Sequence, residues 1–286
     1  MKPITARPPA EDRIVYFGGE AVNYTHTLTA RPDPESVRFR LHSHNMHEIY
    51  YFQQGDADFS IEGTRYRLQK GMLLISASGQ VHHLTVNDPA IPYERTVIMF
   101  QLGLLGTGME ELLFPPNGGN RVFLLDVREQ VWFEETCLGI EESEVGRRFP
   151  VNTLISLIRL LFIKLSSVKE VTGRADPERN ETVNQIVRLI NENLASPLSL
   201  DYIEKNLYRD KAHLNRIFKA AMGCSIWDYV IQKRVHAARQ VLFRTGSVSA
   251  AFAASGFRDY SVFYRNYVRC TQKNPSADLK TLSEEE

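Results

Sequence analysis

Apolar residues recur at helical spacing in the last third of the chain and predict a helix-turn-helix unit there. The two apolar stripes consist of Leu200, Ile203 and Leu207, then of Leu214, Ile217, Phe218 and Ala221. A polar turn at 208–210 separates them, and the carboxylate of Asp210 is placed to cap the second helix. Gly223 predicts the end of that helix, because glycine tolerates a positive φ.

The same plan recurs near residue 250 and predicts a second unit. Ala251 and Ala254 fit a short, closely packed helix, the turn is 255–257, and Asp259 caps the next helix. The residues expected to point inward from that helix are Val262, Phe263 and Tyr267. A longer helix, Ile226–Phe243, is expected to join the two units and to pack on both.

The outward faces of the two second helices carry the candidate binding chemistry. On the first helix these residues are Lys211, Ala212, Asn215, Arg216 and Lys219, and on the second Tyr260, Ser261, Tyr264 and Arg265. A guanidinium pairs with both acceptors of guanine, and an asparagine amide pairs with adenine. We therefore expect Arg216 and Arg265 to be the main readers of double-stranded DNA.

These two units resemble those of the AraC/XylS family of bacterial transcription regulators. The matching residues are Leu200, Leu214, Arg216, Phe218, Lys219, Gly223, Tyr229, Arg234, Ala238, Leu242, Gly256, Phe257, Asp259, Ser261, Phe263, Arg265, Tyr267 and Pro275. The resemblance implies a protein that binds DNA, responds to a small molecule such as a sugar and contacts RNA polymerase. It also implies an activator, because activation is the commoner behaviour in this family.

The first hundred residues have a different pattern, typical of β-strands. Five short segments rich in aromatic and β-branched residues are 48–55, 56–63, 64–71, 72–79 and 93–102. Glycines end four of them at eight-residue spacing, which predicts a small antiparallel barrel or jelly roll with room for one small ligand. Residues 1–20 are expected to form a mobile arm, and 103–120 a surface loop.

Two helices are expected after the strands, at Val127–Glu144 and Val151–Val168. The second is apolar around more than half of its circumference, so it is either deeply buried or shared with a partner subunit. Relatives in the resembled family dimerise through such helices, which implies a homodimer that charged residues at Leu157 and Leu161 should disrupt.

The complete pattern predicts an α+β protein with an N-terminal barrel and a C-terminal helical domain. The expected divisions are an arm at 1–20, a ligand-binding and dimerisation domain at 21–168, a polar linker at 169–180 and a DNA-binding domain at 181–286. A helix over Glu181–Ala195 is expected to open the last domain.

The segment HSHNMHEIYYFQQG holds a candidate ligand site. His42 and His44 are two residues apart and would share one face of a strand. With Glu48 and His82 they resemble the cupin motifs, which implies four ligands for a divalent transition metal. The alternative is a polar effector pocket, made by these four residues and Arg40, that requires no cofactor. His47 and His83 are expected to be exposed.

Charge supports a division between the two halves of the chain. The net charge is zero, but residues from Arg174 onward hold 17 Lys and Arg against 13 Asp and Glu. Such a basic domain suits a phosphate backbone. The three cysteines match no disulfide or zinc pattern. The sequence also lacks the long apolar run that would indicate a secreted or membrane protein, so a cytoplasmic protein is expected.

Two other functions fit parts of the chain. The four cupin-like residues would suit a metal-dependent oxygenase or isomerase with an added helical domain, although such an enzyme does not explain two matched recognition helices. A sensor that binds another protein through its helical domain is disfavoured by the outward arginines. A regulator without enzymatic activity is therefore the expected function.

Overall fold

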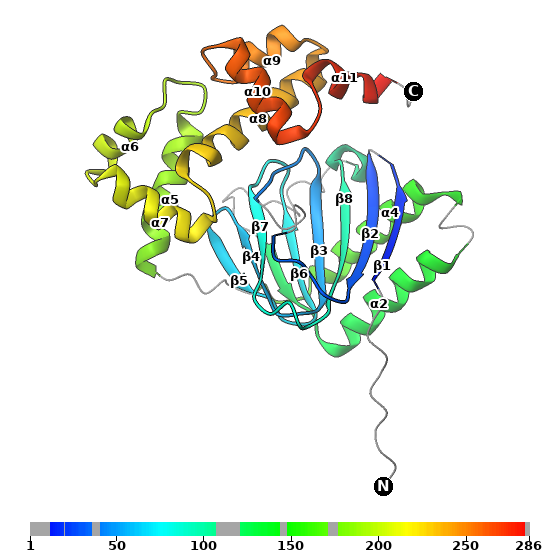
Figure 1. Ribbon diagram of the computed structural model, residues 1–286. Coiled ribbons are helices and arrows are strands. Elements are labelled where there is room, and N and C mark those ends of the chain that lie inside the picture. The colour runs from blue at the N-terminus through cyan, green and yellow to red at the C-terminus, as the bar shows by residue number, and fades with distance from the viewer. Residues whose placement is uncertain are drawn as a thin grey trace.

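The computed structural model describes residues 12–19, 21–35, 41–106, 121–143, 148–170 and 177–283. Antiparallel sheets form the N-terminal part and helices form the C-terminal part, which confirms the predicted α+β class (Figure 1). The helical part lies across one end of the sheets (Figure 1).

The β domain consists of two facing sheets. The larger has the order β1-β2-β8-β3-β6-β9, and the smaller has the order β5-β4-β7. The strands are β1 (Arg13–Gly18), β2 (Val22–Thr29), β3 (His47–Gln54), β4 (Ala57–Ile61), β5 (Thr64–Arg67), β6 (Met72–Ser76), β7 (His82–Val86), β8 (Tyr93–Phe100) and β9 (Arg121–Leu124). Each of the five predicted segments contains one of these strands.

Four strands lie outside the five predicted segments, namely β1, β2, β7 and β9. The prediction of a mobile arm at 1–20 is wrong where β1 forms, because this strand pairs antiparallel with β2 along its whole length. Side chains alternate along β1, and Ile14 and Tyr16 remain exposed, because β1 is the edge strand. β9 follows the expected loop and pairs with β6. Within that loop, Leu102–Leu105 forms a 3-10 helix, and 107–120 lie outside the described residues.

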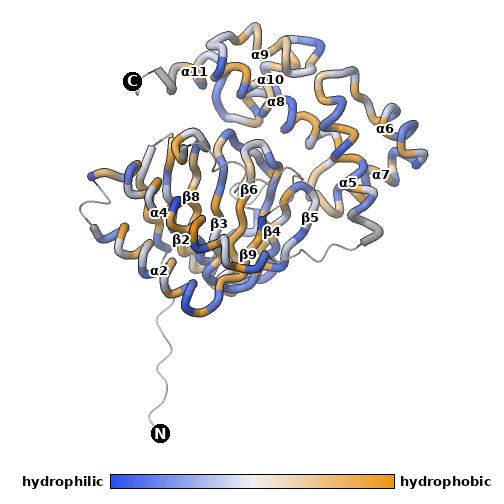
Figure 2. The backbone as a smooth tube through the Cα atoms, turned by 180° about the vertical axis from the view of Figure 1, so that it is seen from behind, coloured by the Kyte–Doolittle hydropathy of each residue, from blue (hydrophilic) through white to orange (hydrophobic). Residues whose placement is uncertain are grey.

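The two faces of the larger sheet are packed differently. Aromatic side chains fill much of the space between the two sheets, among them Tyr50, Phe52, Phe59, Tyr66 and Tyr93. The outer face is covered by α2 (Val127–Glu142) and α4 (Pro150–Leu165) (Figure 1). Apolar segments, drawn in orange, run along the central strands, whereas polar and apolar stretches alternate along the helices (Figure 2).

Helix α4 packs mainly inside its own subunit. Leu157 and Leu161 are 3% and 1% exposed, so they belong to the core and are unsuitable as a test of dimerisation. Leu160 and Ile163 lie on the opposite face and are 44% and 68% exposed. Most of the apolar circumference of this helix therefore packs in the core, and a smaller apolar strip remains exposed.

The C-terminal domain is entirely helical. Its elements are α5 (Pro177–Glu192), α6 (Leu200–Leu207), α7 (Lys211–Met222), α8 (Ile226–Thr245), α9 (Val248–Ala254), α10 (Tyr260–Thr271) and α11 (Pro275–Ser283). α5 begins four residues before the predicted start, and 171–176 of the expected linker lie outside the described residues. Among the described helices, none is long and apolar enough to cross a membrane.

Candidate functional site

Helices α6 and α7 form the first predicted helix-turn-helix unit. The carboxylate of Asp210 accepts a bond of 2.9 Å from the backbone N–H of His213, which caps α7 as expected. Tyr208 adopts φ 53° in the turn, and Gly223 ends α7 at φ 74°. Ile203, Leu214 and Phe218 are buried, so α6 and α7 hold each other in place.

The outward face of α7 carries the predicted residues. Lys211, Ala212, Arg216 and Lys219 are exposed. Arg216 lies 3.0 Å from Nδ1 of His213, and Lys211 pairs with Asp201. Asn215 differs, because its Oδ1 accepts a 2.9 Å bond from the N–H of Ile226 and helps to fix the start of α8.

Helices α9 and α10 repeat this arrangement. Asp259 caps α10 by accepting a 2.8 Å bond from the N–H of Val262. Phe263 and Tyr267 are fully buried, but the prediction that Val262 points inward is wrong, because it is 37% exposed. Ala254 is likewise exposed, since only the Ala251 side of the short α9 meets its neighbours. The outward face holds Tyr260, Ser261, Tyr264 and Arg265, all exposed.

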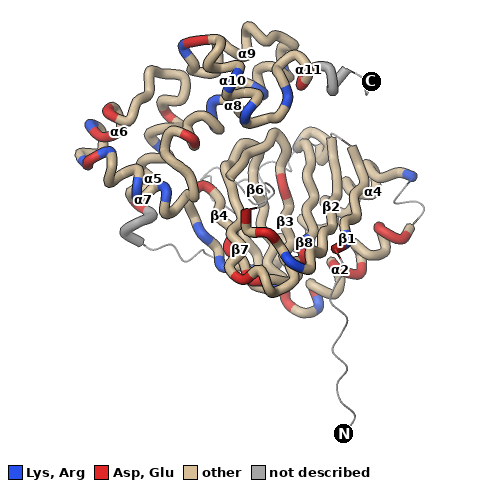
Figure 3. Tube along the Cα trace, viewed as in Figure 1, with Lys and Arg blue, Asp and Glu red and all other residues tan. Residues whose placement is uncertain are grey.

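A single helix, α8, connects the two units and fixes their spacing. The buried guanidinium of Arg234 donates bonds of 3.0 Å to the carbonyls of Leu194 and Ser196. The same group lies 5.7 Å from the ring centre of Trp227 and 5.6 Å from that of Phe257. Arg234 thus ties the start of the first unit to the turn of the second, beside a cleft of about 500 Å³. Lys and Arg recur along α7, α8 and α10 (Figure 3).

The predicted ligand residues converge at the end of the β domain that faces α8. His42 and His82 exchange backbone bonds of 3.0 Å, and donor atoms of His42, His44 and His82 all lie within 4.8 Å of one another. The strand expected for His42 and His44 is reduced to one bridge at His42. Glu48 is buried on β3, and its Oε2 lies 2.8 Å from Nε2 of His44 and 3.6 Å from Nε2 of His82. Arg40 lies outside the described residues.

The hydrogen bonds around these rings determine their tautomers. Nδ1 of His44 lies 2.8 Å from the carbonyl of Met46, and Nδ1 of His82 lies 2.9 Å from that of Gln80. Because a carbonyl only accepts, each Nδ1 carries a proton. Both Nε2 atoms consequently face the same carboxylate oxygen, and Nε2 of the buried His82 makes no hydrogen bond there.

The charges in this cluster depend on one another. Burial opposes ionisation of Glu48, but His82 and His44 outweigh it and hold its pKa well below the usual range. Burial likewise opposes protonation of His82, whereas Glu48 raises the pKa of that imidazole. The carboxylate therefore needs a positive partner, which is either a proton on an Nε2 or a cation between the donors.

Two neighbouring histidines are less exposed than predicted. His47 lies against Phe100 with ring centres 5.5 Å apart, and burial lowers its pKa to about 4. His83 is also half-buried, close to Gly223 of the helical domain, and burial lowers its pKa to about 4. Both predictions are wrong because Phe100 and the end of α7 cover surfaces that strand periodicity alone leaves open.

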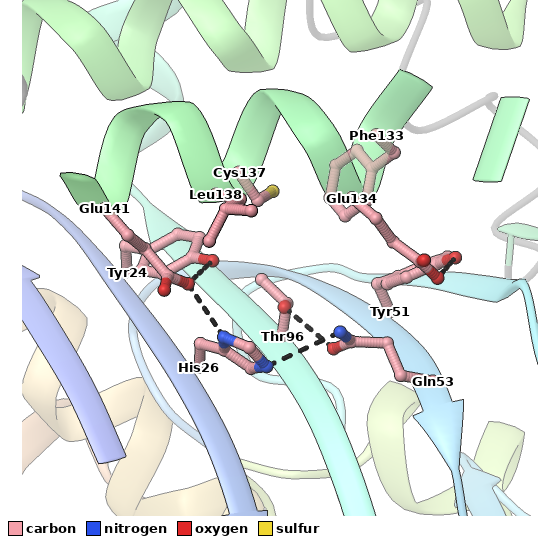
Figure 4. Close-up of a pocket in the computed structure, with 10 residues that line it drawn as sticks. All are labelled: Tyr24, His26, Tyr51, Gln53, Thr96, Phe133, Glu134, Cys137, Leu138 and Glu141. Atoms are coloured by element: carbon pink, nitrogen blue, oxygen red, sulfur yellow. Dashed lines mark hydrogen bonds and ion pairs between the residues drawn. The ribbon is translucent and has the colours of Figure 1, made fainter. Parts of the chain in front are cut away.

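A second polar cluster lies between the larger sheet and α2 and was not predicted (Figure 4). His26 points toward Glu141, with Nδ1 2.7 Å from Oε1, and its Nε2 is 3.0 Å from Glu94. Tyr24 donates a 2.7 Å bond to Glu141, and Arg13 pairs with it at 3.0 Å. The cavity beside these groups measures about 30 Å³, enough for a water molecule rather than an effector.

This geometry defines a class of protein in which a β domain is joined to two helix-turn-helix units. Comparison with known families gives the same division. An AraC-like ligand binding domain matches residues 26–157, and a helix-turn-helix domain matches residues 205–281. The chain belongs to the AraC family of transcription regulators.

Relatives share only parts of the chain. The lactose operon transcription activator of Staphylococcus xylosus is 26% identical over 32% of this chain and 33% of its own. The Msm operon regulatory protein of Streptococcus mutans is 23% identical over 63% of this chain and 66% of its own. The chain therefore spans less than two thirds of each relative's length.

Solved structures show weaker likenesses. ToxT from Vibrio cholerae O395 is 14% identical and covers 92% of this chain and 98% of its own, with a TM-score of 0.38. The DNA-binding domain of AdpA, solved with a target DNA, is 19% identical over 36% of this chain and 94% of its own, with a TM-score of 0.34.

Proposed function

We propose that this protein is a cytoplasmic, ligand-responsive regulator that binds specific DNA sequences and controls transcription without being an enzyme. The observation that supports it best is the pair of capped helices, α7 and α10, held on the single helix α8 with their polar faces exposed. An α-helix fits the major groove, which is about 12 Å wide, and successive turns of a groove lie about 34 Å apart.

In this proposal the exposed residues divide by chemistry. Arg216 and Arg265 read base edges, because their forks match guanine. The remaining exposed contacts, Lys211, Ala212, Lys219, Tyr260, Ser261 and Tyr264, position the helices on phosphates and bases. Asn215 is a weaker candidate for pairing with adenine, since its Oδ1 is already bonded to the start of α8.

We place the effector at the histidine-lined end of the β domain. His42, His44, Glu48 and His82 are the convergent polar groups there, and Arg40 precedes them in the sequence. A sugar or sugar derivative is the proposed class, supported by the name of the lactose operon relative. By analogy with the family, the proposed regulator activates a carbohydrate operon through contact with RNA polymerase.

A homodimer through α2 and α4 completes the proposal. The exposed strip of Leu160 and Ile163 supports this interface, because solvent otherwise covers two large apolar side chains on one helix face. Replacing both with Asp should give monomers of unchanged fold by analytical ultracentrifugation. Ile91→Asp, at a residue 37% exposed elsewhere, should leave the dimer intact. A dimer that persists in the double variant would show that the interface lies elsewhere.

The experiment that tests DNA recognition compares arginine variants on sequences selected by the protein itself. Arg216→Ala and Arg265→Ala should each weaken specific binding by about 1–3 kcal/mol and relax specificity at one position. Arg188→Ala removes the same charge from the exposed face of α5 and should change affinity little. Unchanged binding in both recognition variants would contradict the proposal.

A further inference from the structure

The cleft of about 500 Å³ beside Arg234 lies between the two helix-turn-helix units, and the proposed function gives it no role. Its walls come from the segment between α5 and α6, from the first half of α8, and from the start of α10 with the turn before it. Pockets that hold small organic ligands commonly measure about 300–1,000 Å³ and are lined mainly by apolar side chains with a few polar groups. This inter-unit cleft has the size of such a ligand site.

The walls of the inter-unit cleft are mostly apolar. Leu198 and Ile231 are buried at its base, whereas Trp227 and Val262 line it and remain exposed. Val262, which was expected in the core, therefore faces the cleft instead. An exposed indole and an exposed valine on one concave surface form an apolar patch that the body of a ligand can cover.

Two guanidinium groups line the same cleft. Arg234 is buried, and the two bonds that it donates go to backbone carbonyls, which carry no charge. Burial and the nearby charge of Arg258 both lower the pKa of Arg234. Arg258 is exposed, and within the described part of the chain it has no hydrogen bond or ion pair. The two arginines therefore repel each other across the cleft.

The protein supplies too little negative charge to balance them. Asp259 is the only acid among the described residues that line the cleft, and its Oδ1 already accepts the bond of 2.8 Å that caps α10. One positive charge is thus left without a counter-charge beside an apolar wall. An anionic group placed there would relieve the repulsion between Arg234 and Arg258.

We propose that the inter-unit cleft binds a small amphipathic carboxylate. Its anionic group would lie on Arg258 and Arg234, because a guanidinium fork bonds both oxygens of a carboxylate at once. Its apolar body would lie against Trp227 and Val262. These apolar walls favour such a molecule over a phosphate of DNA, which brings no apolar body. The site lies in the helical domain and is separate from the proposed effector site in the β domain.

Binding is tested on the full chain with hydrocinnamate and with its saturated counterpart, cyclohexanepropanoate. The chain has two tryptophans, so Trp132→Phe leaves Trp227 as a fluorescent reporter inside the cleft. Its emission should change in a saturable way with one equivalent of either carboxylate. The neutral amides of both probes should bind about 10–100-fold more weakly, because they lose a charged hydrogen bond. An unchanged emission with both carboxylates, or equal binding of the amides, would overturn the proposal.

Substitutions locate the site. Arg258→Ala removes the exposed charged donor, and Val262→Asp places a negative charge on the apolar wall. Each should weaken binding of hydrocinnamate by about tenfold or more, with unchanged circular dichroism. Arg244→Ala, which removes the same charge from the exposed end of α8, is the matched control and should bind normally. Undiminished binding in both cleft variants would place the probe elsewhere and overturn the assignment.

The salt dependence of DNA binding separates this proposal from a phosphate site. Each phosphate contact contributes about one unit to the slope of log K against log salt concentration. Arg258→Ala should leave this slope unchanged on a DNA fragment selected by the protein. A slope reduced by about one unit would make Arg258 a phosphate contact and contradict the proposal. Saturable binding of hydrocinnamate by a protein that binds no DNA would support the cleft site and contradict the proposed function.

Discussion

Two clusters of histidine and glutamate lie in the same β domain, and they satisfy their hydrogen bonds differently. In the cluster under α2, His26 places one ring nitrogen on Glu141 and the other on Glu94. In the cluster near α8, His44 and His82 both direct Nε2 at Glu48, and Nε2 of His82 makes no hydrogen bond. The first arrangement is closed and fastens β2 to α2, whereas the second has a place for a ligand.

The two acids are equally buried, and their hydrogen-bond partners show the same contrast. Glu141 receives bonds from Tyr24, Arg13 and His26, so its charge is balanced by its own subunit. Glu48 lies against two imidazoles whose Nδ1–H groups already donate to backbone carbonyls, and it also attracts the buried guanidinium of Arg95. A polar cluster indicates a binding site when its donors and acceptors leave one another incompletely satisfied, and not merely when they are buried.

The largest expected effect is stabilisation by Zn²⁺, which should depend on the cluster near α8 and not on the cluster under α2. At a Zn²⁺ concentration of 100 times Kd, the free energy of unfolding should rise by about 2.7 kcal/mol, because the ion binds only the folded state. Thermal denaturation with and without Zn²⁺ measures this shift. His82→Ala should abolish it and His26→Gln should preserve it. The same shift in both variants would mean that the ion binds elsewhere.

The next effect concerns the closed cluster. His26→Ala should destabilise the protein by about 1.5–3 kcal/mol, because it removes a hydrogen-bonded charged donor from two carboxylates, Glu141 and Glu94. Urea denaturation measures this loss of stability. The control His213→Ala, on the surface, should lower the free energy of unfolding by less than about 0.5 kcal/mol. A loss in His26→Ala as small as that of the control would remove the structural role of this cluster.

The smallest effect is a dependence on pH. Burial disfavours the charged form of His26, but bonds to Glu141 and Glu94 outweigh it and raise its pKa to about 9. Arg13 and Tyr24 also face this group through Glu141. Because the folded pKa lies above the unfolded value of about 6.5, the contribution of His26 is complete below pH 6.5 and is lost as pH rises through 9.

Urea denaturation at both ends of that range checks the sign. The difference in stability between the wild type and His26→Gln should be larger at pH 6 than at pH 9.5. A difference that grows with pH would show that His26 is neutral in the folded protein.

The helical domain was predictable from its sequence because local rules determine most of it. Asp210 and Asp259 cap their helices as expected, and Gly223 ends α7. The error at Val262 arose because periodicity marks a broad apolar face, while the partner helices cover only Phe263 and Tyr267. Which side of a face is covered depends on tertiary packing.

The β domain was predictable where segments rich in β-branched and aromatic residues end at a glycine, as with the four-residue β5. β1, β2, β7 and β9 lie outside those segments; β1 follows a Pro-rich start, and β9 follows a Gly- and Pro-containing segment. The shared face of His42 and His44 was predicted from their spacing, and the addition of Glu48 and His82 was implied by the resemblance to the cupin motifs. The contacts of Glu62 and Gly79 with α8 could not be predicted, since they join residues more than 150 positions apart.

The central claim is that one protomer reads DNA with both α7 and α10, and hydroxyl-radical footprinting on a selected operator tests it most directly. The wild type should protect two major-groove segments on one face of the duplex, about one helical turn apart for each protomer. Arg265→Ala should weaken protection of one segment and leave the other. A single protected segment in the wild type, or equal loss of both in the variant, would contradict recognition by two helices.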